Sequence, residues 1–236
     1  MARLFFRQNS AHRKTPPIHP NQAFRKTPQD LLVAFARQRS FGSLALSYEN
    51  GPLISHIPFQ LSQDGTYLEA HPVRSNPMLQ LLDEAADAVI ATTGPDGYIS
   101  PDWYGVDNQV PIWNHVAVHI CGKLRKLDES ELRGILERLS ASMEARLAPK
   151  PPWTIDKMDA EIFQRMQRQI VSIAMTVDSI QGTFKLSQNK PDAIRSAAAD
   201  GVRNGTKGTE TAALADLMDL RPAARLFRAE INADVN

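Results

Sequence analysis

The chain has 236 residues, of which 42% are hydrophobic and 22% are charged, an ordinary globular composition that allows one domain with a substantial core and points to no extreme class. Its net charge of +1 lacks the strongly basic balance that by itself marks a nucleic-acid binder. A single cysteine, Cys121, excludes an intrachain disulfide and suits a reducing compartment.

The N-terminal stretch, residues 1–17, mixes basic and small residues without a period and ends in Thr15-Pro16-Pro17. This pattern predicts a flexible basic arm. The stretch has no apolar core of signal-peptide length, and no run elsewhere is long and apolar enough to span a membrane. We therefore expect a cytoplasmic protein with no membrane partner.

A β-meander is predicted after a first helix that opens at Thr27-Pro28. Two alternating apolar runs, 41–48 and 52–59, flank Asn50-Gly51, which is a strong hairpin signal. Another turn at Asp64-Gly65 leads into a third strand over 66–70.

The chain beyond the meander predicts more strands, with helices beside them. In order, we expect a helix over 77–86, a strand over 88–93, a loop at 94–97, the segment 98–104 and a long strand over 110–127. Five or more antiparallel strands favour a closed barrel, and the flanking helices make the fold class α+β.

Two amphipathic helices are predicted within 128–170, and alternating residues over 171–177 then return the chain to the sheet. The helical pair is therefore an insertion in the barrel domain, which we place at 18–200, and no separate domain. A helix that opens at Pro191 ends near Gly201, and a C-terminal helical tail follows over 201–236.

The heptapeptide "HPVRSNP", residues 71–77, combines an arginine, a serine and a helix start. Asn76 suits the cap of a helix and Pro77 its first position. Free backbone N–H groups at such a start, with Arg74 and Ser75 beside them, predict a phosphate seat. The alternative is a capped helix with an unrelated surface arginine.

Several reaction classes lose their support, because the chain has no Walker-type glycine loop, no Cys-x-x-Cys pair, no dinucleotide glycine motif and no nucleophile elbow. His115, His119 and Cys121 share one face of the long strand, yet no carboxylate stands at ligand spacing. We expect hydrogen-bonded core side chains here and no metal site. An anion seat with aromatic residues nearby suits FMN, although another phosphorylated ligand would satisfy the same groups.

Five blocks of sequence, in this order, resemble one known family: "SHIPF", "HPVRSNP", "YISPDWY", "VPIWNHVAVHICG" and "KLSQNK". They are similar to the signature blocks of the PaiB-like FMN-binding negative transcriptional regulators, and the likeness runs from about residue 18 to 200. The resemblance implies an FMN-binding split β-barrel related to pyridoxamine-phosphate oxidases and flavin reductases. It also implies a homodimer with FMN at the subunit interface.

Carried over by position, the resemblance implies where each part of FMN binds. The phosphate would lie near Arg74, Ser75 and Asn76, with His71 close by, and the flavin ring would lie against Ser55, His56, Ile57 and Pro58. The residues expected to approach from the other side of the barrel or from the partner subunit are Trp113, Asn114, Lys185, Ser187 and Gln188. No residue is assigned a catalytic role.

Two functions follow from the resemblance and the chemistry of the cofactor. The first is a negative transcriptional regulator with DNA as a candidate partner, although no helix-turn-helix with a basic recognition helix is evident. The alternative is a flavin-dependent oxidoreductase that uses NAD(P)H and a small substrate, because the cofactor itself would carry the reaction.

Overall fold

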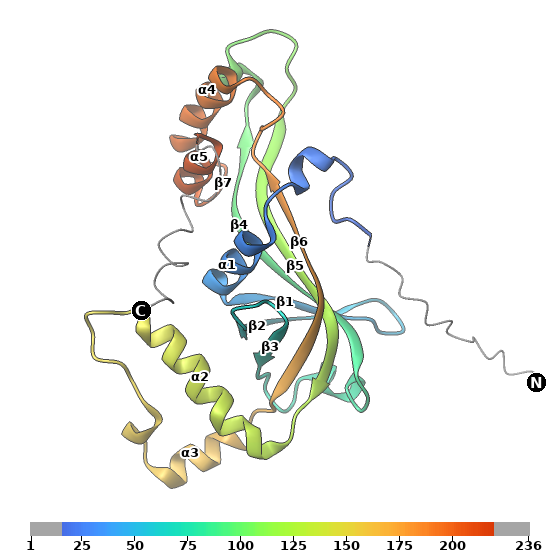
Figure 1. The fold of residues 1–236 in the computed structure, drawn as a ribbon, viewed down its shortest axis with the longest axis vertical. Coiled ribbons are helices and arrows are strands. Elements are labelled where there is room, and N and C mark those ends of the chain that lie inside the picture. The colour runs from blue at the N-terminus through green and yellow to red at the C-terminus, as the bar shows by residue number, and fades with distance from the viewer. Residues whose placement is uncertain (1–15, 220–236) are drawn as a thin grey trace, which may run out of the picture.

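A computed structural model describes residues 16–219 and shows a closed ring of antiparallel strands with helices at both ends (Figure 1). The order in the sheet is β1-β2-β3-β6-β5-β4-β7, and an additional β1–β4 pairing closes the ring. The strands are β1 (Phe41–Leu46), β2 (Leu53–Leu61), β3 (Tyr67–Ala70), β4 (Ala86–Ile99), β5 (Ile112–Lys126), β6 (Ile173–Lys185) and β7 (Gly208–Thr209). The predicted α+β fold with a split β-barrel is confirmed.

Two pairs of helices, α2 with α3 and α4 with α5, lie at opposite ends of the long strands β4, β5 and β6, and α1 lies beside the middle of these strands (Figure 1). The helices are α1 (Gln29–Arg39), α2 (Leu132–Ala145), α3 (Ala160–Gln167), α4 (Asp192–Arg203) and α5 (Thr211–Asp219). Helices α2 and α3 form the predicted insertion between β5 and β6, whereas α4 and α5 pack together at the other end. None of the helices within residues 16–219 is both long and apolar enough to cross a membrane.

The core fills the barrel and extends under the C-terminal helices. Phe35 of α1 enters the core, where its ring meets that of Phe184 edge to face at 5.9 Å. Leu214 and Met218 of α5 belong to the same buried cluster. The described part of the expected tail thus packs with the barrel, and the expected boundary at residue 200 falls inside α4. Residues 1–15 of the expected arm and 220–236 of the expected tail lie outside the described residues.

Gly122 permits the irregular pairing of β5 with β6. The β5–β6 register shifts between Cys121 and Gly122. A Cβ atom at Gly122 would lie 2.1 Å from the carbonyl oxygen of Thr176, so only glycine permits this approach of the two strands.

The predicted helix over 77–86 is wrong in type and length. The chain forms a single 3₁₀ turn, η2 (Pro77–Leu81), and is already in β4 at Ala86. That turn buries Met78 and Leu79. Pairing of Ala86 with Leu124 of β5 then draws the chain into the sheet, because tertiary pairing overrides local helix propensity.

The loop predicted at 94–97 is also wrong, because β4 continues through it. Asp96 and Gly97 pair with β5 on one side and with β7 on the other, and the irregularity is confined to the step from Thr93 to Asp96. The strand predicted over 171–177 likewise extends to Lys185 as β6. The first helix begins at Gln29 after its N-cap residue Pro28, and no side chain caps it.

Candidate functional site

The loop 71–76 lies beside β2, as the meander predicts. Phe59 of β2 pairs with Ala70, the last residue of β3, so the loop leaves the sheet next to the strand that carries Ser55. The amide nitrogen Nδ2 of Asn76 donates a hydrogen bond to Oγ of Ser55 at 2.9 Å. Segments 55–58 and 71–76, expected to contact ring and phosphate, are therefore neighbours.

Asn76 caps the 3₁₀ turn, as the sequence predicts. Its Oδ1 accepts a hydrogen bond from the backbone N–H of Met78 at 3.0 Å, and Pro77 occupies the first position. A 3₁₀ helix this short has only a small dipole, so the predicted contribution of an α-helical dipole to anion binding is not available. Attraction for a phosphate at this loop must come from the side chains, Arg74 above all.

Replacing Asn76 with alanine removes both of its hydrogen bonds, and we expect a loss of about 1–2 kcal/mol in the free energy of unfolding. Urea unfolding of the flavin-free protein measures the loss. Asn76→Asp is the matched control, because it retains an acceptor for the N–H of Met78 and should lose less. Equal stability of Asn76→Ala and wild type would contradict the assigned cap.

Arg74 is the cation of the loop, and its side chain is 48% exposed. Its Nε donates to the carbonyl oxygen of Arg168 at 2.7 Å, and its Nη2 donates to that of Ile170 at 3.2 Å. The same Nη2 lies 2.9 Å from Oε1 of Glu129. Arg74 thus links the loop to both ends of the helical insertion, while Ser75 beside it is exposed.

The other predicted residues of this group differ in what they offer a ligand. His56 and Pro58 are exposed on the outer face of β2, whereas Ile57 is buried in the core. Nδ1 of His56 lies 3.0 Å from Oγ of Ser43 on β1. His71 is partly buried, and this burial lowers the pKa of its imidazole below the ordinary value.

The second predicted group lies at the far end of the sheet, near α4 and α5. Asn114 is 0% exposed, and its Nδ2 donates to Oγ of Ser187 at 2.9 Å and approaches Sδ of Met218 at 3.5 Å. Oγ of the buried Ser187 also lies 3.1 Å from the hydroxyl of Tyr104. In this arrangement the side chains of Asn114 and Ser187 join strand to helix and face no open surface.

Trp113, Lys185 and Gln188 complete this second group at the same end. Trp113 is 45% exposed, and its Nε1 donates to Oδ1 of Asp96 at 3.0 Å. Lys185 is partly buried and pairs in register with His115. Gln188 uses its amide within its own turn, where Oε1 accepts from the N–H of Leu186 at 2.7 Å.

The two predicted groups are well separated within one subunit. Following the strand register from Ser55 across β1 and β4 leads to Ile120 on β5. Asn114 lies six residues from Ile120 along β5, about 20 Å at the rise of an extended strand. The assignment of both groups to one cofactor stays a prediction, and it requires the second group to come from a partner subunit.

The outer face of the ring carries two histidines among small and apolar side chains, and nothing in residues 16–219 fully covers this face. Register places His56, Ser43, Ala91 and His119 in one row across β2, β1, β4 and β5. Beside this row are further apolar residues that are exposed or partly exposed: Phe41, Ala45, Ile54, Pro58, Val89 and Ala117. A solvated sheet face is normally polar, so an apolar one indicates a contact surface.

Two histidines of β5, His115 and His119, favour their neutral forms. Burial lowers the pKa of His119, and burial together with the nearby charge of Lys185 lowers that of His115. Within residues 16–219 no three His, Cys, Asp or Glu side chains are arranged to hold a metal ion.

These pKa shifts predict a loss of stability in mild acid. The unfolded chain, with ordinary histidine pKa values near 6.5, binds more protons than the native state below about pH 7, so the free energy of unfolding falls as the pH is lowered from 7 to 5.5. Thermal melts across this range measure the effect. His119→Gln, which cannot titrate, should show a shallower dependence, and identical slopes would contradict the assignment.

Fold and site together define a split-barrel protein whose exposed cationic side chain, Arg74, lies in a loop next to β2. The groups present fit FMN: Arg74 and Ser75 are exposed for a phosphate, and the exposed His56 and Pro58 lie on the adjacent strand for a planar ring. The hydrogen bond between Asn76 and Ser55 holds the two parts together.

Comparison with known sequences establishes the family. Residues 18–179 match the family described as "Putative FMN-binding domain", and the chain belongs to this family. It is also 30% identical over 169 residues to "Protease synthase and sporulation protein PAI 2" of Bacillus subtilis (strain 168), covering 71% of this chain and 80% of that protein. The protein is thus an FMN-binding split barrel of the family that the five sequence blocks indicate.

Solved structures agree with the fold. The structure of the FAD and heme binding protein from Mycobacterium smegmatis superposes with a TM-score of 0.51 at 18% identity, over 78% of this chain and 82% of that one. The flavocytochrome Anf3 from Azotobacter vinelandii gives a TM-score of 0.51 at 12% identity, over 71% and 72% of the two chains. At these identities the likeness concerns the fold alone.

Sequence reasoning missed two partners of the predicted site residues. Glu129 contacts Arg74 from 55 positions away, and Tyr104 contacts Ser187 from 83 positions away. Tyr104 lies in the block "YISPDWY", so its motif was noted without its partner. No local pattern marks Glu129, since it is one of several acidic residues at a helix start.

Proposed function

We propose that this protein is a cytoplasmic, homodimeric negative transcriptional regulator that binds FMN between its subunits. The observation that carries the proposal is the hydrogen bond between Asn76, in the loop that carries Arg74, and Ser55 of β2, a strand whose other face presents the exposed His56 and Pro58. A flavin on β2 next to that face would be enclosed by a second copy. Membership of the FMN-binding family, and the resemblance to PaiB-like regulators, support the cofactor and the role.

Each group of residues would have a defined task in such a dimer. Arg74 and Ser75 would bind the phosphate, and Asn76 would hold this loop against Ser55 of β2. Bound FMN would supply a planar redox-active ring, and the exposed His56 and Pro58 would contact that ring. Trp113 and Lys185 of the partner subunit would approach it from the far end of its sheet.

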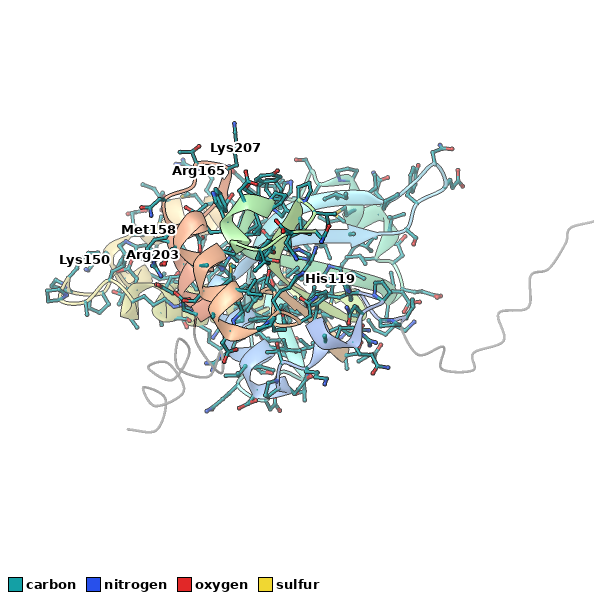
Figure 2. All side chains as sticks on the ribbon, turned by 90° about the horizontal axis from the view of Figure 1, so that it is seen from above. His119, Lys150, Met158, Arg165, Arg203 and Lys207 are labelled. Atoms are coloured by element: carbon teal, nitrogen blue, oxygen red, sulfur yellow. The ribbon has the colours of Figure 1, made fainter. Side chains whose placement is uncertain are left out.

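DNA is the partner that the regulatory role requires. The net charge of +1 means that any contact with phosphates must be local rather than spread over the whole molecule. Figure 2 shows Lys150 at the outer tip of the helical insertion and Lys207 projecting from the body of the protein. These two lysines, which lie on separate parts of the described chain, are candidate contacts for DNA phosphates.

The test combines the absorption spectrum of bound flavin, its reduction by NADH or NADPH, and a DNA footprint on the protein's own promoter. We expect the purified protein to retain about one FMN per subunit after gel filtration, and to protect a site in its own promoter from cleavage. Deletion of the gene should raise transcription from that promoter. Absence of both the footprint and the change in transcription would refute the regulatory role.

The same purified protein also distinguishes the alternative function, a flavin-dependent oxidoreductase, from the regulator. Rapid bleaching of the flavin band by NADH or NADPH without oxygen, combined with no footprint, would identify the flavin-dependent oxidoreductase instead. A flavin that stays oxidised under these conditions is the result expected for the regulator.

A further inference from the structure

The helical insertion is attached directly to the loop that carries Arg74. The backbone N–H of Arg74 donates to the carbonyl oxygen of Gln169 at 2.7 Å, and that of Val171 donates to the carbonyl oxygen of Pro72 at 3.0 Å. Val73 and Ile170 form an antiparallel bridge between these contacts. The loop therefore pairs like a short strand with the chain that leaves α3.

Glu129 supplies the only negative charge that contacts Arg74 among the described residues. It lies in the 3₁₀ turn Glu129–Glu131, where the insertion begins after β5. Its carboxylate Oε1 is 2.9 Å from Nη2 of Arg74, and its side chain is 81% exposed. An ion pair this exposed is weak, so a stronger anion can replace it.

A phosphate monoester is that stronger anion. It carries up to two negative charges and can accept two parallel hydrogen bonds from one guanidinium. A phosphate on Arg74 and the carboxylate of Glu129 would compete for the same Nη2 and would repel each other. Either the carboxylate moves away or the phosphate binds less tightly.

We infer that Glu129 is an internal competitor for the phosphate of FMN at Arg74 and so sets the affinity of the site. The inference deepens the proposed cofactor site and rests on it. Since Glu129 begins the insertion, phosphate binding and the contact between insertion and loop are linked. By reciprocity, a partner that stabilises the Arg74–Glu129 pair lowers the affinity for FMN.

The experiment compares Glu129→Gln with wild type in titrations with FMN and with riboflavin, which lacks the phosphate. We expect Glu129→Gln to bind FMN about 2- to 5-fold more tightly, with no change for riboflavin. Glu131→Gln is the matched control, because it removes the same charge from the same turn without contacting Arg74. It should bind both ligands as wild type does.

The outcomes separate this inference from the proposed site. Equal FMN affinity of Glu129→Gln and wild type, or an equal gain for FMN and riboflavin, would overturn the role of Glu129 while leaving the cofactor site intact. If wild type and all variants bind FMN no more tightly than riboflavin, the phosphate does not bind at Arg74. That result would refute the phosphate seat and the inference that rests on it. Circular dichroism tests whether each variant is folded. Glu129→Asp keeps the negative charge at this position and should bind FMN as wild type does.

Discussion

Arg74→Ala is expected to weaken FMN binding about 10- to 100-fold, because charge-assisted hydrogen bonds to a phosphate contribute about 1.5–3 kcal/mol. The affinity for riboflavin should stay close to that of wild type, since riboflavin has no phosphate for Arg74 to bind. Fluorescence titration measures both constants. Glu129 opposes the phosphate in wild type, so the loss should lie nearer the lower end of this range.

Lys185→Ala is the control, and its effect should be smaller. Lys185 pairs in register with His115 at the far end of β5, where it would meet a cofactor only across a subunit interface. Arg74 also donates to the carbonyl oxygens of Arg168 and Ile170, so a thermal melt must show that the variant is folded. Retention of FMN by Arg74→Ala at wild-type affinity would remove the phosphate from this loop.

Ala91→Arg is expected to convert the proposed dimer to a monomer and to release its FMN. Ala91 lies on β4 in the middle of the outer-face row, between Ser43 and His119. An arginine there would bring an unpaired charge into an apolar contact, at a cost of about 3–5 kcal/mol. This corresponds to a dimer weakened by about a hundredfold or more.

Sedimentation and the flavin absorbance of the same sample measure the two effects together. Ala141→Arg makes the same substitution on the exposed surface of α2 and should leave dimer and flavin unchanged. If Ala91→Arg fails to fold, Ala117→Arg tests the same face from β5. A folded monomer that retains FMN would show that one subunit is sufficient for the site.

Local chemistry explains the features that could be predicted from the sequence. The hairpin at Asn50-Gly51, the cap formed by Asn76 ahead of Pro77 and the alternation along β5 depend on residues that are close in the chain. The likeness of five separate blocks to one family then identified the split barrel, which the strand topology and the solved structures support, and FMN, which the family match supports.

Predictions were wrong where distant pairing decides the local structure. The loop expected at 94–97 became part of β4, because β5 and β7 supply hydrogen-bond partners on both sides. The helix expected over 77–86 ended after one turn, because Ala86 pairs with Leu124. In both places long-range hydrogen bonds outweigh a weak local preference.

The sequence by itself determined the strand pattern, the capped turn after Arg74 and the family, because each depends on short-range contacts or on the order of motifs. Only the tertiary structure decided that β1 pairs with β4 to close the ring, that Asn114 is buried beneath α5, and that Glu129 contacts Arg74. Those contacts join residues far apart in the chain. Their free energy comes from burial and pairing that no local pattern encodes.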